Sequence, residues 1–156
     1  MNANPIVTKL QPPSSSPDLK LPNSIYLHIP FCRRRCFYCD FAVSVVGDRK
    51  HGDNSTMIQD YVEILCQEIA QESVIIPASS LNTIFFGGGT PSLLSVDQLQ
   101  RILKVVDQKF GIANNAEISM EVDPGTFDRE KLQGFLNLGV NRVSLGVQVF
   151  QDKLLQ

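Results

Sequence analysis

Three cysteines in the first third of the sequence are spaced so that they could bind a metal centre. Cys32, Cys36 and Cys39 form a C-x-x-x-C-x-x-C pattern directly after an apolar stretch. Three thiolates can hold three irons of a cubane and leave one iron open for an exchangeable ligand. Zinc would need a fourth ligand, for which only His28 and Cys66 lie nearby, and Cys66 falls on the apolar stripe of a predicted helix. The spacing favours an iron–sulfur cluster, with zinc and redox-active thiols as alternatives.

The segments around these cysteines alternate between strand and helix patterns. Strands are predicted at residues 25–29, 82–86, 117–122 and 142–149. Amphipathic helices follow the first three strands, and a further helical pattern begins at residue 150. Four β-α units in series imply a parallel sheet with right-handed crossovers, either open or curved into a barrel.

Polar residues at helix starts predict where the three helices begin. Thr56 with Gln59, and Ser95 with Gln98, each have the spacing of a capping box. Thr126 is predicted to cap the third helix.

The alternation of side chains along the strands favours the barrel. A parallel strand covered on both faces normally has a continuous apolar run, whereas one face of three strands is polar here. The polar faces hold Tyr26, His28, Ser119, Glu121, Asp123, Ser144 and Gln148. The apolar faces hold Ile25, Leu27, Ile29, Ile118, Met120, Val122, Val143, Leu145 and Val147. The predicted fold class is therefore α/β, a partial (β/α) parallel barrel of four units, with an outer helix layer and a polar binding cavity inside.

The two ends of the chain differ from its middle. Six of the nine prolines lie in the first 30 residues, so residues 1–22 are predicted to be a disordered, Pro/Ser-rich lead-in. Residues 23–156 are predicted to form one domain. Because four strands do not close a barrel, we expect this domain to be truncated at its C-terminal end.

Composition excludes several classes of function. The 14 Lys and Arg against 16 Asp and Glu give a net charge of -2, which offers no electrostatic case for nucleic acid or an anionic membrane as the main partner. No apolar run approaches the roughly 18 residues of a spanning helix. Only four cysteines and no secretory signal pattern are present, so a cytosolic location is expected.

Four motifs in order resemble those of radical S-adenosylmethionine (SAM) enzymes. The stretch SIYLHIPFC at 24–32 leads into the cysteine pattern, followed by GGGTP at 87–91, EVDP at 121–124 and GVQ at 146–148. Over residues 24–150 the chain is most similar to the oxygen-independent coproporphyrinogen III oxidase family. The resemblance implies a parallel (β/α) partial barrel with its metal centre in the loop after the first strand.

The resemblance also implies roles for individual residues. Cys32, Cys36 and Cys39 would hold three irons of a [4Fe-4S] cluster, and the methionine end of SAM would chelate the fourth. Glycines would let the backbone approach the cofactor closely, since no Cβ intervenes. The implied SAM-binding residues are Tyr26, Tyr38, Gly88, Gly89, Thr90, Glu121 and Gln148.

The family has two branches that bear on function. The oxidase branch decarboxylates porphyrinogen propionates by radical chemistry and has a further cysteine two residues after the third cluster ligand. This chain has Phe41 there, as in the haem chaperone branch, which puts oxidase activity in doubt. We therefore expect a haem chaperone that delivers haem to an acceptor protein and takes electrons from a donor. The oxidase, acting on porphyrinogen, is the alternative, and a zinc-binding structural module is a third hypothesis.

Overall fold

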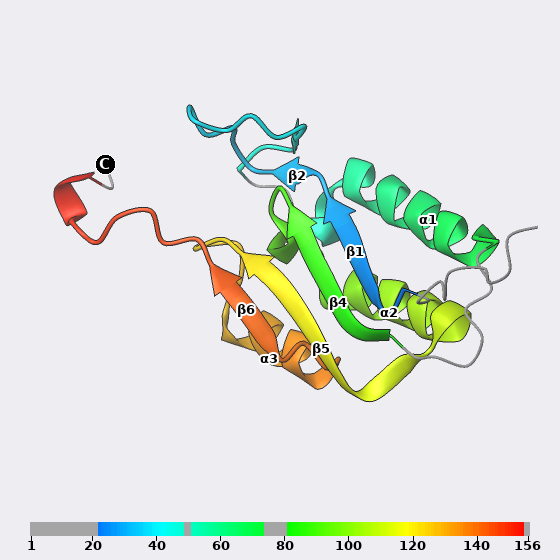
Figure 1. The fold of residues 1–156 in the computed structure, drawn as a ribbon. Coiled ribbons are helices and arrows are strands. Elements are labelled where there is room, and N and C mark those ends of the chain that lie inside the picture. The colour runs from blue at the N-terminus through cyan, green and yellow to red at the C-terminus, as the bar shows by residue number, and fades with distance from the viewer. Residues whose placement is uncertain (1–21, 49–50, 74–80, 155–156) are drawn as a thin grey trace, which may run out of the picture.

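A four-stranded parallel sheet forms the centre of the chain. The computed structural model describes residues 22–48, 51–73 and 81–154, so the predicted lead-in lies outside the described residues except for Pro22. The strand order is β1-β4-β5-β6, with every neighbouring pair parallel. The strands span Ser24–Ile29 (β1), Leu81–Gly88 (β4), Ile112–Val122 (β5) and Arg142–Leu145 (β6). All four arrows in Figure 1 point toward the same edge of the sheet.

Three helices connect these strands and lie on one face of the sheet (Figure 1). They span Thr56–Gln71 (α1), Val96–Phe110 (α2) and Arg129–Asn137 (α3). The smaller elements are β2 (Phe31–Cys32), β3 (Ser44–Val45), and the 3-10 turns η1 (Gly52–Asn54), η2 (Pro91–Leu93) and η3 (Asp152–Leu154). The prediction of an α/β fold with a parallel sheet in a partial barrel is thereby confirmed.

The capping prediction holds for α2 and is off by one residue for α1. Ser95 Oγ accepts from the Gln98 N–H at 3.2 Å, while Gln98 Oε1 accepts from the Ser95 N–H at 3.0 Å, so two end groups of α2 are satisfied reciprocally. In α1 the cap is Ser55, whose hydroxyl accepts from the Ile58 N–H at 3.5 Å. Thr56 is instead the first helical residue.

The predicted cap of α3 is wrong. Asp128 caps this helix, and its Oδ1 accepts from the Lys131 N–H at 2.8 Å. Thr126 is buried, and its hydroxyl donates to the Asp123 carbonyl at 2.7 Å. A loop contact inside the protein therefore takes the hydroxyl that the local pattern assigned to the helix.

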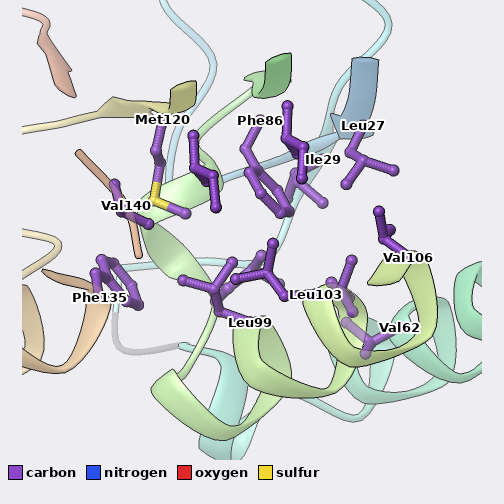
Figure 2. Packing of buried hydrophobic residues seen from close by; sticks show 14 of the residues in the cluster. Leu27, Ile29, Val62, Phe86, Leu99, Leu103, Val106, Met120, Phe135 and Val140 are labelled. Atoms are coloured by element: carbon purple, nitrogen blue, oxygen red, sulfur yellow. The ribbon is translucent and has the colours of Figure 1, made fainter. Parts of the chain in front are cut away.

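The hydrophobic core fills the space between the sheet and the helices, where side chains from both layers meet (Figure 2). The predicted apolar faces of β1 and β5 contribute Leu27, Ile29, Ile118, Met120 and Val122, all buried. Cys66 is 6% exposed within the same cluster, so its prediction as a core cysteine is confirmed.

The last predicted strand and helix differ from the structure. β6 ends at Leu145, and among residues 150–154 only the short turn η3 forms, while residues 155 and 156 lie outside the described part. Val143, Leu145 and Val147 are 51%, 50% and 43% exposed, although their face was predicted to be covered. α1, α2 and α3 all precede β6, and each packs alongside its neighbours, α1 on α2 and α2 on α3. Among the described residues, no α-helix follows β6 to cover this face.

Replacing a core residue of α2 tests this layer arrangement. Ile102 is fully buried, so Ile102→Ala is expected to lower the free energy of unfolding by about 2–5 kcal/mol, because it leaves a cavity under the sheet. Ile64 lies on α1 with 62% of its surface exposed, so Ile64→Ala is the matched control. It is expected to change the free energy of unfolding by less than about 0.5 kcal/mol. Urea unfolding measures both, and equal effects would contradict the layer arrangement.

Candidate functional site

A pocket of about 1070 Å³ lies at the carboxyl ends of the strands. Loops after β1, β4, β5 and β6 line it, because parallel strands deliver their following loops to one edge. Nine of the ten predicted site residues line this pocket: Cys32, Cys36, Tyr38, Cys39, Gly88, Gly89, Thr90, Glu121 and Gln148. Side chains separated by more than 100 positions in the sequence are thus brought together.

Tyr26 is the predicted site residue that does not line the pocket. Its hydroxyl lies 2.9 Å from Nδ1 of His28, and its ring stacks on Phe85 with the centroids 5.9 Å apart. The side chain is 56% exposed on the polar face of β1. Tyr26 thus lies on the open surface of the sheet.

The loop that carries the cysteines is closed at its base by the short parallel pair β2–β3. The Ser44 N–H donates to the Pro30 carbonyl at 2.7 Å, and the Val46 N–H donates to the Cys32 carbonyl at 2.9 Å. Figure 1 shows this segment projecting beyond the ends of the central strands. Cys36 and Cys39 are therefore in a loop whose two ends are held side by side.

The three thiols differ in exposure. Cys32 and Cys39 are half-buried, whereas Cys36 is exposed. Burial raises the pKa of the Cys32 thiol, an effect opposed by the hydrogen bond that the Thr90 hydroxyl donates to Sγ at 3.6 Å and reinforced by the two other thiols. The neighbouring Cys36 is the main cause that raises the pKa of the Tyr38 hydroxyl, and burial, Cys39 and Asp123 raise it further. The three cysteines and Tyr38 therefore form one electrostatically interacting group.

The glycines at the end of β4 allow the cysteine loop to approach this strand. A Cβ on Gly89 would lie 2.6 Å from the Phe31 carbonyl oxygen and 3.0 Å from Cys32 Sγ, so only glycine fits without displacement. Gly88 has a φ of +116°, a region that glycine adopts readily, and its N–H donates to Glu121 Oε2 at 3.1 Å. These glycines serve contacts within the protein.

Three further contacts, made by Tyr38 and Arg33, join the cysteine loop to the other loops of the pocket. The Tyr38 hydroxyl donates to Gln148 Oε1 at 2.7 Å, across 110 residues of sequence. Arg33 donates to the Pro124 carbonyl at 3.3 Å and forms an ion pair with Asp123 at 3.9 Å. Burial raises the pKa of Asp123, and Arg33 opposes this shift.

Arg33 and Asp123 both line the pocket and were not among the predicted site residues. Alternate residues along a strand lie on the same face, so Asp123 follows Glu121 on the polar face. This alternation could have indicated Asp123 as a site residue. The contact with Arg33 had no such signal, because it joins two loops that are distant in sequence.

The donor set fits an iron–sulfur cluster in its chemistry. Three thiols border one pocket, and the absence of a Cβ on Gly89 lets β4 lie close to Cys32 Sγ. Among the described residues, no three His, Cys, Asp or Glu side chains are gathered closely enough to ligate a single metal ion. In a cubane each thiolate binds a different iron, so its thiolates need not converge on one point.

Comparisons with known proteins identify a matching family model and several similar proteins. The family model described as the radical SAM superfamily matches residues 26–156. A relative from Synechocystis named Heme chaperone HemW is 55% identical over 135 residues, covering 86% of this chain and 32% of the relative. The Heme chaperone HemW of Escherichia coli K12 is 38% identical over 136 residues, covering 86% of this chain and 34% of the relative.

A solved structure has the same fold. The coproporphyrinogen III oxidase (HemN) of Escherichia coli, described as a radical SAM enzyme, matches with a TM-score of 0.75 and 33% identity. The match covers 85% of this chain and 29% of the oxidase. This chain thus spans about a third of the length of these relatives. None of the helices described here has the length and apolar character needed to cross a membrane.

The reactivity of the thiols tests the geometry of the site. In metal-free protein under anaerobic conditions, we expect a maleimide to label Cys36 first and Cys66 last, because the former is exposed and the latter buried. Because burial raises the pKa of Cys32, its thiolate fraction is low at neutral pH. The rate at which maleimide labels Cys32 is therefore expected to increase as the pH is raised above neutral. Peptide mass mapping over time measures each rate. Equal rates at Cys36 and Cys66 would contradict this structure.

Proposed function

Because this chain belongs to the radical SAM superfamily, we propose that it binds a [4Fe-4S] cluster and SAM, and that the complete protein is a haem chaperone. The observation that carries the proposal is the convergence of the three cysteines with Gly88, Gly89, Thr90, Glu121 and Gln148 around one pocket. The 55% identity to a relative named Heme chaperone HemW supports the choice of branch.

The residues of the pocket would divide the binding between them. Cys32, Cys36 and Cys39 would hold the cluster, which when bound would supply an open iron for SAM to chelate and an electron for SAM. Glu121 keeps one carboxylate oxygen on the Gly88 N–H and would use the other toward the SAM amine. Gln148, fixed by the Tyr38 hydroxyl, would orient its amide group toward the same ligand. Tyr26, outside the pocket lining, would contact the cofactor only from the open face of the sheet.

Phe41 supports the chaperone over the oxidase. It lines the pocket and is 66% exposed, at the position where the resemblance implies a further cysteine in oxidases. A phenyl ring can pack against a ligand or shield it, and it supplies no thiol. Since the oxidase shares the scaffold with a TM-score of 0.75, the fold does not separate the two functions. Haem as cargo, an acceptor protein and an electron donor belong to this proposal.

Removing single thiols tests the cluster. Anaerobically reconstituted protein is expected to absorb broadly near 400 nm, as [4Fe-4S] proteins do, and Cys32→Ala, Cys36→Ala or Cys39→Ala should each abolish that band because each removes one iron ligand. Cys66→Ala, which replaces a core cysteine, is the control and should retain it. Iron and sulfide analysis accompany the spectra. One zinc per chain without iron after anaerobic preparation would favour the zinc-binding module instead.

Titration with haem tests the choice between chaperone and oxidase. The complete protein is expected to bind about one haem per chain, measured as a Soret shift, and to leave coproporphyrinogen III unchanged when SAM and a reductant are added anaerobically. Phe41→Cys is not expected to create oxidase activity, since substrate positioning depends on many other residues. Turnover of coproporphyrinogen III by the unmodified protein would overturn the chaperone proposal.

A further inference from the structure

Two buried hydroxyl groups connect the loops that follow β4 and β5. Ser92, in η2, is fully buried, and its Oγ lies 2.5 Å from Oγ1 of Thr126, which is 2% exposed. Thr126 donates its hydroxyl proton to the Asp123 carbonyl at 2.7 Å, so Ser92 must be the donor between the two hydroxyls. Ser92 Oγ also accepts from the Asp123 N–H at 3.1 Å. The chain of bonds therefore runs from one loop into the other.

Lys131, on the first turn of α3, joins the same two loops from the helix side. Its Nζ donates to the Ser92 carbonyl at 2.7 Å and to the Thr126 carbonyl at 3.2 Å, and it lies 5.7 Å from the centroid of the Phe135 ring. Burial lowers the pKa of Lys131, an effect opposed by Asp53 and Asp128. An ammonium group thus bridges one carbonyl of each loop in a partly desolvated position, where charge-assisted hydrogen bonds are strong.

The bridged loops are the ones that face the pocket. Residues 88–90 immediately precede η2, and residues 121–123 immediately precede the turn that holds Thr126. Gly88 and Glu121 are hydrogen-bonded to one another on the pocket side. The pocket lining does not include Lys131, Ser92 or Thr126. Any effect of these residues on ligand binding must therefore act through the two loops.

We propose that Lys131 is a positioning residue that sets the spacing of the loops at 88–92 and 121–126 and thereby the affinity of the pocket for SAM. The inference rests on the proposed function, because SAM is the ligand to which both loops would be fitted. Misplacing a contact residue by a fraction of an ångström weakens a site with several simultaneous contacts, and this is the effect expected when the bridge is removed.

Substitutions of Lys131 in the complete, anaerobically reconstituted protein test the proposal. Lys131→Met keeps the chain length but removes the ammonium group, and it is expected to weaken SAM binding roughly tenfold with the iron content unchanged. Lys131→Arg restores a cationic donor and should return the dissociation constant to within about threefold of the unmodified value. Hydrogen exchange should speed up at residues 87–93 and 121–127 in Lys131→Met but not in Lys131→Arg.

Two controls separate positioning from general stability. Lys104→Met removes an exposed lysine from α2, and Ile102→Val destabilises the core without touching the loops, so both should bind SAM as the unmodified protein does. Thr126→Val, which breaks the hydroxyl chain, gives a second route if Lys131→Met does not fold, and it should also weaken binding and speed exchange in both loops.

The possible outcomes decide each part of the inference. Unchanged affinity and unchanged exchange in Lys131→Met, or an equal loss of affinity in Ile102→Val, would overturn the positioning role. If the unmodified protein does not bind SAM, the proposed function fails. In that case faster exchange of both loops in Lys131→Met still supports the spacing role, and unchanged exchange overturns it.

Discussion

The parallel register of β1, β4 and β5 is the constraint on which the whole site depends. Ile29 pairs with Gly88, and Phe86 pairs with Met120, so the three strands end at nearly the same level. The loops that follow them therefore start side by side, although they are far apart in sequence. The contacts between these loops, including the bond between the Gly88 N–H and Glu121, presuppose this alignment. If the pairing register of one strand shifted by one residue, its apolar side chains would move to the open face and its polar side chains to the core face.

The sheet separates stability from chemistry by its two faces. Leu27 and Ile29 point into the core between sheet and helices, while Tyr26 and His28 of the same strand remain on the open face. Successive side chains of a strand point to opposite faces of the sheet. The apolar positions are therefore constrained by core packing, and the polar positions by their contacts on the open face. This division explains how one scaffold can be found both in relatives named chaperones and in an oxidase.

Local patterns were sufficient to predict much of this arrangement. The periodicity of apolar residues predicted the three helices and four strands, and strand parity placed Glu121 on the open face. The cysteine spacing and the glycine run identified two of the loops that meet at the pocket. These features depend on residues that are close together in sequence, which is why a single sequence reveals them.

What the sequence did not reveal depends on contacts between distant segments. Thr126 has the residue type of a helix cap, but its hydroxyl is used by Ser92, 34 residues earlier. Arg33 reaches Pro124 across 91 residues, and Lys131 reaches Ser92 across 39. The exposed face of β6 was predicted to be covered because its apolar alternation resembles that of β1 and β5, yet covering requires a neighbouring element that no strand pattern encodes.

The short parallel pair β2–β3 at the base of the cysteine loop allows the length and composition of that loop to vary. Backbone bonds at Ser44 and Val46 fix the return of the chain independently of the side chains within the loop. Lengthening a flexible loop whose ends are already held costs little, since each doubling of its length adds only about 0.6 kcal/mol of closure entropy. The stretch from Asp40 to Val43, which contains Phe41, can therefore change in length and composition while β1 keeps its register. Divergence among relatives can accumulate beside the pocket without refolding the sheet beneath it.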